Sequence, residues 1–500
     1  MSTKDQPATF QLDDTDVPAL RNAISHIVRA GYSETRVRER LGLSDIADIK
    51  WRAIPIYRKE QLTVRDALDS AIDLFLLQGA ISKDELNQLF DMVDQDFLVR
   101  VGLLLFDERG YVRSRASLFP VGGFLIFSDH TWPKLPHPGF RIIPYDQVMF
   151  VGADSRWLSR ATVRRAVAST LDLCTGSGIH AILAAAHSQR VLAVDINPRA
   201  ADCTRFNAQA SGATNVEIAV GDLFDPVRGE RFDLITANPP FVPSPVNSLG
   251  FRDGGSSGED VQRRIVEGLP LHLAPGGIAQ IVTELGERDD ELISDRLRKW
   301  LGDAPMDILI LRLREHSAAN YAIGHAQGDY DFGEFLDSVD DWAENLRTQG
   351  YSRIVSVLLA FQWSDPACGP SWTRIEETTP PIREAGSEVE SLIYAERMAR
   401  NPGLFSMLVQ SRICRAGTVG LMESRMLGSG IRTNTQAQLL GKSLSIFHWL
   451  DPIERDILEL MDEPLGMSEL ILHASEIKID GESVFKAVAS LIRRGLVNIN

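Results

Sequence analysis

The fold of this chain is decided by Leu171-Asp172-Leu173-Cys174-Thr175-Gly176-Ser177-Gly178. The stretch joins an apolar approach to an alanine-rich run, which predicts a buried strand ending near Leu173 and a helix beginning at about Ile179. Gly176 and Gly178 can adopt positive φ and carry no Cβ, so a ligand can lie against their backbone. The helix N-terminus behind them offers unpaired N–H groups. The pattern predicts a cofactor-binding turn, although a glycine turn between a strand and a helix is often only a turn.

Two acidic motifs follow at the ends of the next two expected strands. The strand Arg190–Val194 leads to Asp195-Ile196, nineteen residues beyond Gly176. An acidic residue at this place in a doubly wound sheet can accept both ribose hydroxyls of a nucleoside. The strand Val216–Val220 then leads to Asp222-Leu223, where a short carboxylate can accept the amino group of adenine.

A fourth expected strand, Phe232–Ala237, runs into Asn238-Pro239-Pro240-Phe241. All four motifs therefore follow strands of one α/β sheet. Because ligands of open α/β sheets bind at the carboxyl ends of the strands, the motifs are expected on one edge of that sheet.

In this order the motifs resemble those of class I S-adenosylmethionine-dependent methyltransferases. Leu171–Gly178 with Asn238–Phe241 resembles the HemK-type glutamine N-methyltransferases and the related "small methyltransferase" enzymes that modify guanine or adenine in RNA. The resemblance covers about Val151 to Trp363 and implies a Rossmann-like, seven-stranded core that binds S-adenosyl-L-methionine. It implies cofactor contacts from Asp172, Cys174, Thr175, Gly176, Ser177, Gly178, Asp195, Ile196, Asp222, Leu223 and Asn238, and catalytic roles for Asn238, Pro239, Pro240 and Phe241.

Two rival glycine-rich sites fit the sequence less well. A dinucleotide-binding Rossmann unit prefers Gly-x-Gly-x-x-Gly, whereas Ala181 occupies the third glycine position here and Cys174 or Gly176 the first, depending on register. A nucleotide kinase needs Gly-Lys-Ser/Thr after its loop, and this chain has Gly178-Ile179-His180.

The Asn238–Phe241 motif suits methyl transfer to a nitrogen. An amide or exocyclic amine has a delocalised lone pair, which must be placed in line with the S–CH₃ bond. The Asn238 side chain and the Pro239 carbonyl, fixed by the rigid proline pair, can accept the N–H groups, and Phe241 offers a flat face to a planar substrate. HemK-type proteins have Tyr where this chain has Phe241, so stacking is kept and the phenol hydroxyl is lost. A tight turn after a strand is the competing interpretation.

Other segments could contribute to the site. Arg252–Asp260 resembles the glycine-rich segment that succeeds Asn-Pro-Pro-Tyr in HemK-type enzymes, and either a substrate cover or a plain connecting loop fits it. Asp154, Arg156 and Ser159 precede the first core strand and are candidate contacts near the methionine end of the cofactor; a solvated turn and helix cap fits them as well. His130–Tyr145 contains four prolines and reads as a linker or lid.

The connection Arg314–Tyr351 is unusually long and rich in aromatic and acidic residues. A long insertion near the strand ends can build a substrate pocket. His316 and Tyr321 are the residues to test there, although a surface histidine usually has no such role.

Composition limits the class of protein. The 500 residues are 44% hydrophobic with a formal net charge of −16, which favours a soluble protein and disfavours an extended nucleic-acid footprint. The four cysteines are widely scattered, so neither zinc nor a disulfide framework is expected, and a reducing cytoplasm fits. The polar segment Met1–Asp14 does not resemble a signal peptide, and no apolar run approaches the roughly 18 residues of a membrane span.

Three domains are expected. Residues 1–145 form an α+β accessory domain, with helices followed by short strands such as Val99–Phe106. Residues 146–365 form the methyltransferase core with the insertion 314–351. Residues 366–500 form a C-terminal accessory domain that ends in a winged-helix-like module.

The winged-helix pattern comes from the last fifty residues. Pro452–Met461, Met467–His473 and Glu482–Arg494 read as helices and Leu496–Ile499 as a strand. The third helix could enter a DNA groove, but it has few basic residues, and the charge of nearby acidic residues offsets theirs. A protein-contact or packing role is favoured over nucleic-acid binding.

The methyl acceptor stays open between four hypotheses. The first is a glutamine-like amide or amine of a protein or peptide, and the second is an adenine or guanine amino group in RNA or DNA. The third is a small metabolite that accepts methyl on nitrogen or sulfur. The fourth is a cofactor-binding regulatory protein without transfer activity. The acidic composition disfavours the nucleic-acid hypothesis, and the intact Asn238–Phe241 motif disfavours the regulatory one. Nothing in the sequence separates a protein or peptide acceptor from a small metabolite.

Overall fold

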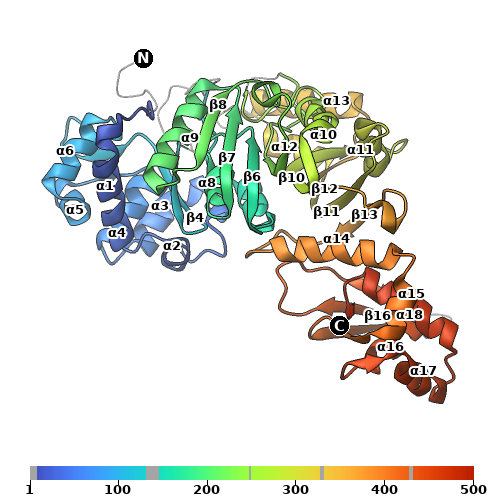
Figure 1. The fold of residues 1–500 in the computed structure, drawn as a ribbon. Helices are drawn as coiled ribbons and strands as arrows, with labels where there is room; N and C mark the ends of the chain where they lie inside the picture. The colour runs from blue at the N-terminus through green and yellow to red at the C-terminus, as the bar shows by residue number, and fades with distance from the viewer. Residues whose placement is uncertain (1–7, 131–145, 247–248, 327–330, 427–431, 500) are drawn as a thin grey trace. The chain divides into compact units, whose positions relative to one another are not determined.

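The computed structural model describes residues 8–130, 146–246, 249–326, 331–426 and 432–499. Most of the expected linker or lid, His130–Tyr145, lies outside these ranges. Internal contacts divide the chain into two units, which are described separately (Figure 1). The first unit is Met1–Ser159, Arg165–Trp300 and Ser317–Ile354; the second is Arg160–Arg164, Leu301–His316 and Val355–Asn500. The expected domain limits at residues 145 and 365 stay predictions.

A parallel sheet forms the centre of the first unit and confirms the α/β expectation. Its strands have the spatial order β10-β9-β6-β7-β8. They are β6 (Val167–Leu173), β7 (Ser188–Asp195), β8 (Val216–Val220), β9 (Phe232–Ala237) and β10 (Leu273–Glu287). The chain moves outward from β6 through β7 to β8 and then returns to the other side of β6 as β9. The strand order therefore reverses between β6 and β9, where open α/β sheets bind their ligands.

Seven helices precede, connect or follow these strands in the part of the chain from Ala153 to Thr348 that the structure describes. They are α7 (Ala153–Ala161), α8 (Ile179–Ala185), α9 (Pro198–Ser211), α10 (Asp260–His272), α11 (Ile293–Leu301), α12 (Ala318–His325) and α13 (Phe332–Thr348). In Figure 1, α8 and α9 lie against β7 and β8, which they contact. The ends of α9 follow local sequence: the Asn197 side chain caps its start, and Gly212, with φ 76°, ends it.

The N-terminal part combines short helices with two small antiparallel sheets. The helices are α1 (Val17–Arg29), α2 (Glu34–Leu41), α3 (Ile54–Ile56), α4 (Ala67–Ala71), α5 (Lys83–Leu89) and α6 (Met92–Arg100). The strands β1 (Ala80–Ile81), β3 (Val112–Ser114) and β2 (Leu104–Phe106) form one sheet, and β4 (Ser117–Val121) with β5 (Phe124–Ser128) the other. The expected strand Val99–Phe106 is wrong in its first half. Asp91 caps α6, and the helix continues to Arg100 because Phe97 and Leu98 are buried by it.

The N-terminal part shares one hydrophobic core with helices α8 and α9. Residues from α1 to β5 cluster with Ile179, Ile182 and Leu183 of α8 and with Phe206 of α9. Phe127 packs edge-on against Phe206 with ring centroids 5.3 Å apart. The accessory residues therefore support the helices that follow the cofactor turn.

The second unit contains the remaining strands of the core. β11 (Met306–Ser317), β12 (Arg353–Trp363) and β13 (Thr373–Glu377) are neighbours in the order β13-β11-β12. Strands β6 to β12 account for the seven that were expected, and β13 adds one more by pairing parallel with β11. The sheet therefore has one strand more than the seven expected, because the polar segment after Trp363 returns to the edge of the sheet as β13.

The rest of the second unit is α+β. Its helices are α14 (Gly386–Arg400), α15 (Leu404–Gln410), α16 (Pro452–Glu459), α17 (Met467–Glu476) and α18 (Gly481–Arg493). Its strands are β14 (Arg412–Arg415), β15 (Val419–Met426), β16 (Arg432–Leu439), β17 (His448–Leu450), β18 (Leu465–Gly466) and β19 (Val497–Ile499), in two sheets of order β18-β14-β19 and β15-β16-β17. The three C-terminal helices and the final strand occur where they were expected, while the winged-helix assignment stays a prediction. None of the helices in the described ranges is long and apolar enough to cross a membrane.

Candidate active site

The turn after β6 has the backbone that the glycines predict. Cys174, Gly176 and Gly178 have φ values of 55°, 58° and 81°. A Cβ on Gly178 would lie 2.8 Å from Thr204 Cγ2 of α9, so glycine is required here by conformation and by space. On Gly176, a Cβ would come no closer than 4.0 Å to the Cys174 carbonyl oxygen, which leaves open space beside the turn. Asn207 of α9 also holds the turn, by donating from Nδ2 to the Ser177 carbonyl at 2.8 Å.

Asp172 joins this turn to the neighbouring strand β9. Its Oδ2 accepts a hydrogen bond from Thr175 Oγ1 at 2.6 Å, and its Oδ1 accepts one from Thr236 Oγ1 at 2.7 Å. Burial raises the pKa of the carboxyl group from 3.8 to about 6. Direct contact of Asp172 with the cofactor stays a prediction, and its position gives it a second role in holding the turn.

Asp195-Ile196 lies where β7 ends. Asp195 Oδ2 accepts from the Gly176 N–H at 2.8 Å, and Oδ1 accepts from the Asn197 N–H at 2.9 Å. Burial raises the pKa of this carboxyl group, and the two backbone donors oppose that shift. Each carboxylate oxygen has more than one lone-pair site, so ribose hydroxyls can still bind. Ile196 is 68% exposed at the rim.

Asp222-Leu223 follows β8, and the structure adds a partner that sequence reasoning missed. Asp222 Oδ2 accepts from Arg264 Nη2 of α10 at 2.7 Å. An adenine amino group would therefore share this carboxylate with a guanidinium. Leu223 is buried and has a φ of 49°, so strained backbone occurs here as it does at Cys174.

The register of β6 and β9 brings the glycine turn beside Asn238. Leu173 pairs with Ala237, so Cys174 and Asn238 leave the sheet at the same level. Asn238 Nδ2 donates to Asp154 Oδ2 and to Ser155 Oγ, both at 3.0 Å. With its nitrogen held by α7, the side-chain oxygen of Asn238 is the atom that can accept a hydrogen bond from a substrate. Burial raises the pKa of Asp154, although the Asn238 hydrogen bond opposes the shift.

Arg156 and Ser159, the other two candidate contacts that precede the first core strand, hold α7 in place. Arg156 is fully buried, and its Nη1 lies 3.0 Å from Glu34 Oε1 while Nη2 donates to the Pro120 carbonyl at 3.2 Å. Ser159 Oγ donates to the Arg156 carbonyl at 2.8 Å. Arg156 thus ties α7, and with it Asp154, to the N-terminal part.

The insertion lies in two different units. Tyr321 of α12 belongs to a buried cluster against which Phe241 packs, and its hydroxyl donates to Glu284 Oε2 at 2.6 Å. His316 is exposed on β11 in the second unit. The structure therefore brings Tyr321 to the Asn238–Phe241 motif, and a role for His316 stays a prediction.

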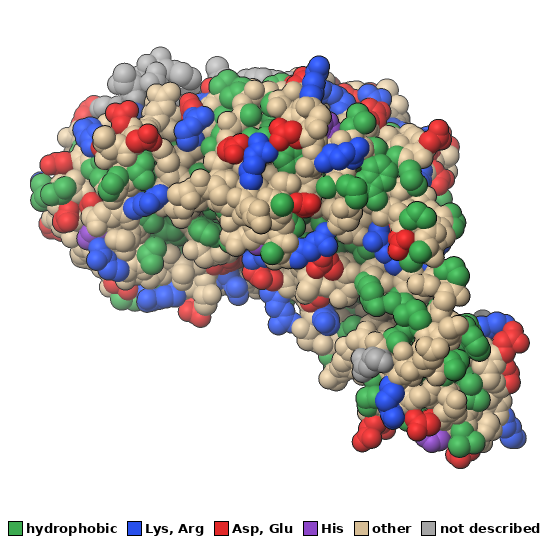
Figure 2. Space-filling view, viewed as in Figure 1, with side chains coloured by type: hydrophobic (Ala, Val, Ile, Leu, Met, Phe, Trp, Pro, Cys, Tyr) green, Lys and Arg blue, Asp and Glu red, His purple; other side chains and the backbone are tan. Residues whose placement is uncertain are grey.

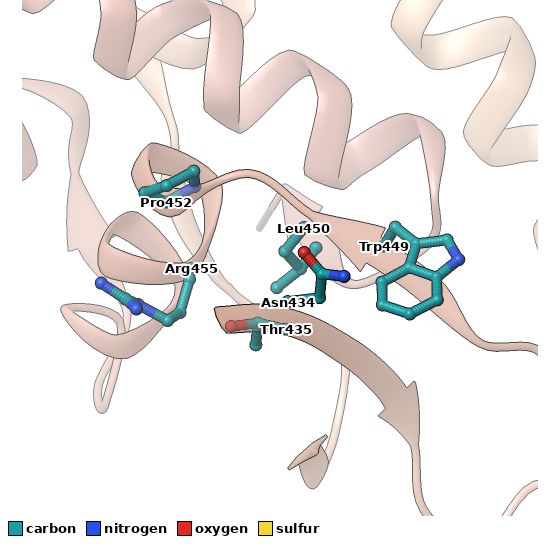
Figure 3. A pocket seen from close by; sticks show the side chains of 6 residues that line it. All are labelled: Asn434, Thr435, Trp449, Leu450, Pro452 and Arg455. Atoms are coloured by element: carbon teal, nitrogen blue, oxygen red, sulfur yellow. The ribbon is translucent and has the colours of Figure 1, made fainter. Parts of the chain in front are cut away.

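Two further features share none of these residues. His26, Asp91 and Asp94 bring three potential ligand atoms within 4.8 Å of one another, but His26 Nε2 already lies 3.2 Å from Asp94 Oδ2. A hollow of about 330 Å³ lies in the second unit, between β16, β17 and α16; Figure 3 shows the side chains that line it. It is lined by Asn434, Thr435, Trp449, Leu450, Pro452 and Arg455.

Comparison with known proteins indicates the family to which the chain belongs. Residues 153–301 match the model of the methyltransferase small domain. A release factor glutamine methyltransferase of Geobacter sulfurreducens is 32% identical over 222 residues, which cover 39% of this chain and 75% of that protein. A ribosomal protein uL3 glutamine methyltransferase of Bradyrhizobium diazoefficiens is 41% identical over 144 residues, or 26% of this chain and 44% of that protein. The chain thus spans about half the length of that second relative. The solved structure of ribosomal protein L11 methylase from Lactobacillus delbrueckii aligns with 43% of this chain and 77% of its own at 19% identity and a TM-score of 0.26.

Asp195→Ala is expected to lower the affinity for S-adenosylmethionine by about 100-fold or more, because two ribose hydroxyls lose a charged acceptor. Isothermal titration calorimetry measures the effect. Asp225→Ala is the matched control, since Asp225 is largely exposed and pairs with Arg228. Unchanged affinity in Asp195→Ala would mean that the ribose does not bind at the end of β7.

Asp172→Asn is expected to remove a pH dependence of stability. The folded-state pKa is raised to about 6, so the folded protein holds this proton more tightly than the unfolded chain. The unfolding free energy of the wild type should therefore fall, relative to the variant, by up to about 3 kcal/mol as pH rises from about 4 to 6. Urea unfolding of both proteins at pH 4 and pH 7 measures the difference in unfolding free energy between wild type and variant. The same difference at both pH values would contradict the prediction.

Proposed function

Because this chain belongs to the small-domain family of S-adenosylmethionine-dependent methyltransferases, we propose that it methylates the side-chain amide nitrogen of a glutamine in a protein. The observation that carries the proposal is the hydrogen bonding of Asn238. Its nitrogen is held by Asp154 and Ser155, so its oxygen is directed to the acceptor from beside the cofactor turn.

The cofactor fits the residues at the strand ends. The open space at Gly176, the Asp195 carboxylate and the exposed Ile196 suit a nucleoside with an extended tail. When bound, S-adenosylmethionine supplies an electrophilic methyl group on a sulfonium. The chain then has to place a poor nucleophile, because the lone pair of an amide nitrogen is delocalised into its carbonyl group.

Asn238 and Pro239 perform this placement. The Asn238 side-chain oxygen and the Pro239 carbonyl accept the two N–H groups of the amide and turn the nitrogen lone pair toward the methyl group. With S-adenosylmethionine bound, the nitrogen would take its methyl group, the sulfur would keep the electron pair of the broken S–C bond, and one N–H proton would leave to solvent. Phe241 packs against the planar amide. No strong base is needed, because a methylated amide nitrogen loses its proton readily.

The named relatives favour a protein acceptor. One is named for methylating a release factor and the other for methylating ribosomal protein uL3, in both cases on glutamine. The acidic composition, with 68 acidic against 52 basic residues, disfavours a nucleic-acid acceptor. On the face shown in Figure 2, Lys and Arg are interspersed with Asp and Glu. On α18, Arg493 pairs with Glu396 and Lys486 with Glu482, which supports a protein-contact or packing role for this helix over nucleic-acid binding.

A labelling experiment tests the acceptor class. The protein is incubated with methyl-labelled S-adenosylmethionine and an extract divided into protein, nucleic-acid and small-molecule fractions. Label in protein that yields N5-methylglutamine on enzymatic digestion to amino acids supports the proposal. Label in the small-molecule fraction would identify a metabolite enzyme, label in RNA or DNA would identify a base methyltransferase, and no label in any fraction would favour a regulatory protein.

Asn238→Ala is expected to lower kcat by about 100-fold or more while the affinity for S-adenosylmethionine stays within a few fold. The lost hydrogen bond orients the reacting nitrogen, which matters most in the transition state. Label transfer and calorimetry measure the two quantities. If turnover survives within a few fold, the acceptor is not an N–H group held by this motif.

Asp154→Ala is expected to lower kcat by about tenfold, because the Asn238 amide can then rotate and present its nitrogen to the acceptor. Asp225→Ala serves again as the control. A thermal unfolding scan shows whether the variant is folded, and an unchanged kcat would show that Asp154 does not orient Asn238.

A further inference from the structure

The loop that follows Phe241 lies directly on the Asn238–Phe241 backbone. The Val242 N–H donates to the Arg252 carbonyl at 2.9 Å, and the Gly254 N–H donates to the Val242 carbonyl at 3.0 Å. A Cβ on Gly258 would lie 2.4 Å from the Phe241 carbonyl oxygen. Residues 252–259 are here called the glycine loop. Its backbone approaches the backbone of the motif so closely that glycine is required at the contact. Movement of this loop would therefore displace the acceptor motif.

The helices α12 and α13 cover the motif and the loop. Tyr321 of α12 and Trp342 and Leu346 of α13 are buried in one cluster with Val242, and Phe241 packs against it. The Arg252 guanidinium lies over the Trp342 ring, 5.6 Å from its centroid. The insertion thus contacts both the acceptor motif and the glycine loop.

One side chain of α13 joins both segments. Asn345 Nδ2 donates to the Pro243 carbonyl at 3.1 Å and to the Ser256 carbonyl at 2.9 Å. A primary amide nitrogen carries two hydrogens, and here each meets a carbonyl of a different segment. Tyr351, which follows α13, adds a third bond by donating from its hydroxyl to the Ser257 carbonyl at 2.9 Å.

We propose that α12 and α13 form a clamp on the acceptor motif and that Asn345 is its positioning residue. Asn345 fixes the spacing between Pro243 and Ser256, and through the close contact at Gly258 it fixes the carbonyl edge of Pro239–Phe241. The inference rests on the proposed role of Asn238 and Pro239 in holding the acceptor nitrogen. It assigns the insertion to acceptor placement and leaves cofactor binding to the strand ends of β6, β7 and β8.

The test compares three variants of the full chain. Asn345→Leu keeps the size of the side chain and removes both donors, while Asn345→Gln keeps the donors on a longer stem. Glu344→Ala is the matched control, because Glu344 is the exposed neighbour on α13 that pairs with Arg347. Each variant is examined by hydrogen–deuterium exchange, by calorimetry with S-adenosylmethionine, and by label transfer to purified release factor and to ribosomal protein uL3 as probes.

Exchange at residues 242–258 is expected to rise at least tenfold in Asn345→Leu and to stay at the wild-type level in Glu344→Ala, with residues 172–180 unchanged in both. The kcat on whichever probe accepts methyl should fall by about 10- to 100-fold in Asn345→Leu, with cofactor affinity kept and with partial recovery in Asn345→Gln.

The exchange measurement needs no acceptor, so it separates the two proposals. Unchanged exchange at residues 242–258 would overturn the clamp whether or not either probe is methylated. Raised exchange with unchanged kcat would overturn the positioning role of Asn345. Failure of the wild type to methylate either probe, with raised exchange in Asn345→Leu, would support the clamp and count against the proposed substrate.

Discussion

The hydrogen bonds of Asp172 are the constraint on which the site depends. One carboxylate binds Thr175 in the turn after β6 and Thr236 in β9, across the place where the strand order reverses. In the proposed function, the cofactor turn follows the first of these strands and the acceptor motif follows the second. A small change in their relative register would move the methyl donor away from the acceptor, because the two motifs come from segments more than sixty residues apart in the chain. The buried position of Asp172 raises its pKa, so this connection is made at a cost in stability at neutral pH.

Much of the central sheet could be predicted because each motif follows a strand. Four apolar runs, each ending in glycine, an acid or Asn-Pro-Pro-Phe, indicate parallel strands whose carboxyl ends lie together. The turn at Gly176 and Gly178 needs only local reasoning, since both its conformation and the start of α8 follow from neighbouring residues. The strand expected at Val99 failed for the opposite reason: the apolar period there fits a strand, but burial against the N-terminal core extends α6.

The pairings that orient the site could not be predicted in this way. Asp154 is eighty-four residues from Asn238 in the sequence, and nothing in the local pattern around either residue indicates the other. Arg264 on Asp222 and Asn345 on Pro243 are similar cases, in which a side chain on a helix surface reads as an ordinary solvated residue. The one available signal was the place of Asp154 just before the first core strand, and it did not distinguish Asp154 from Arg156, which faces the N-terminal part instead.

The polarity of hydrogen bonding at Asn238 constrains the proposed acceptor. Because Asp154 and Ser155 hold the nitrogen of Asn238, the two groups that we propose contact the acceptor are both oxygens, one from this side chain and one from the Pro239 carbonyl. Two acceptors at one point select a nitrogen with two N–H bonds, as in a primary amide or an exocyclic amine. A thiolate would meet two electron-rich oxygens without a proton between them, which costs free energy. This argument favours nitrogen over sulfur as the acceptor, and the charge of the chain then favours the amide over the base of a nucleic acid.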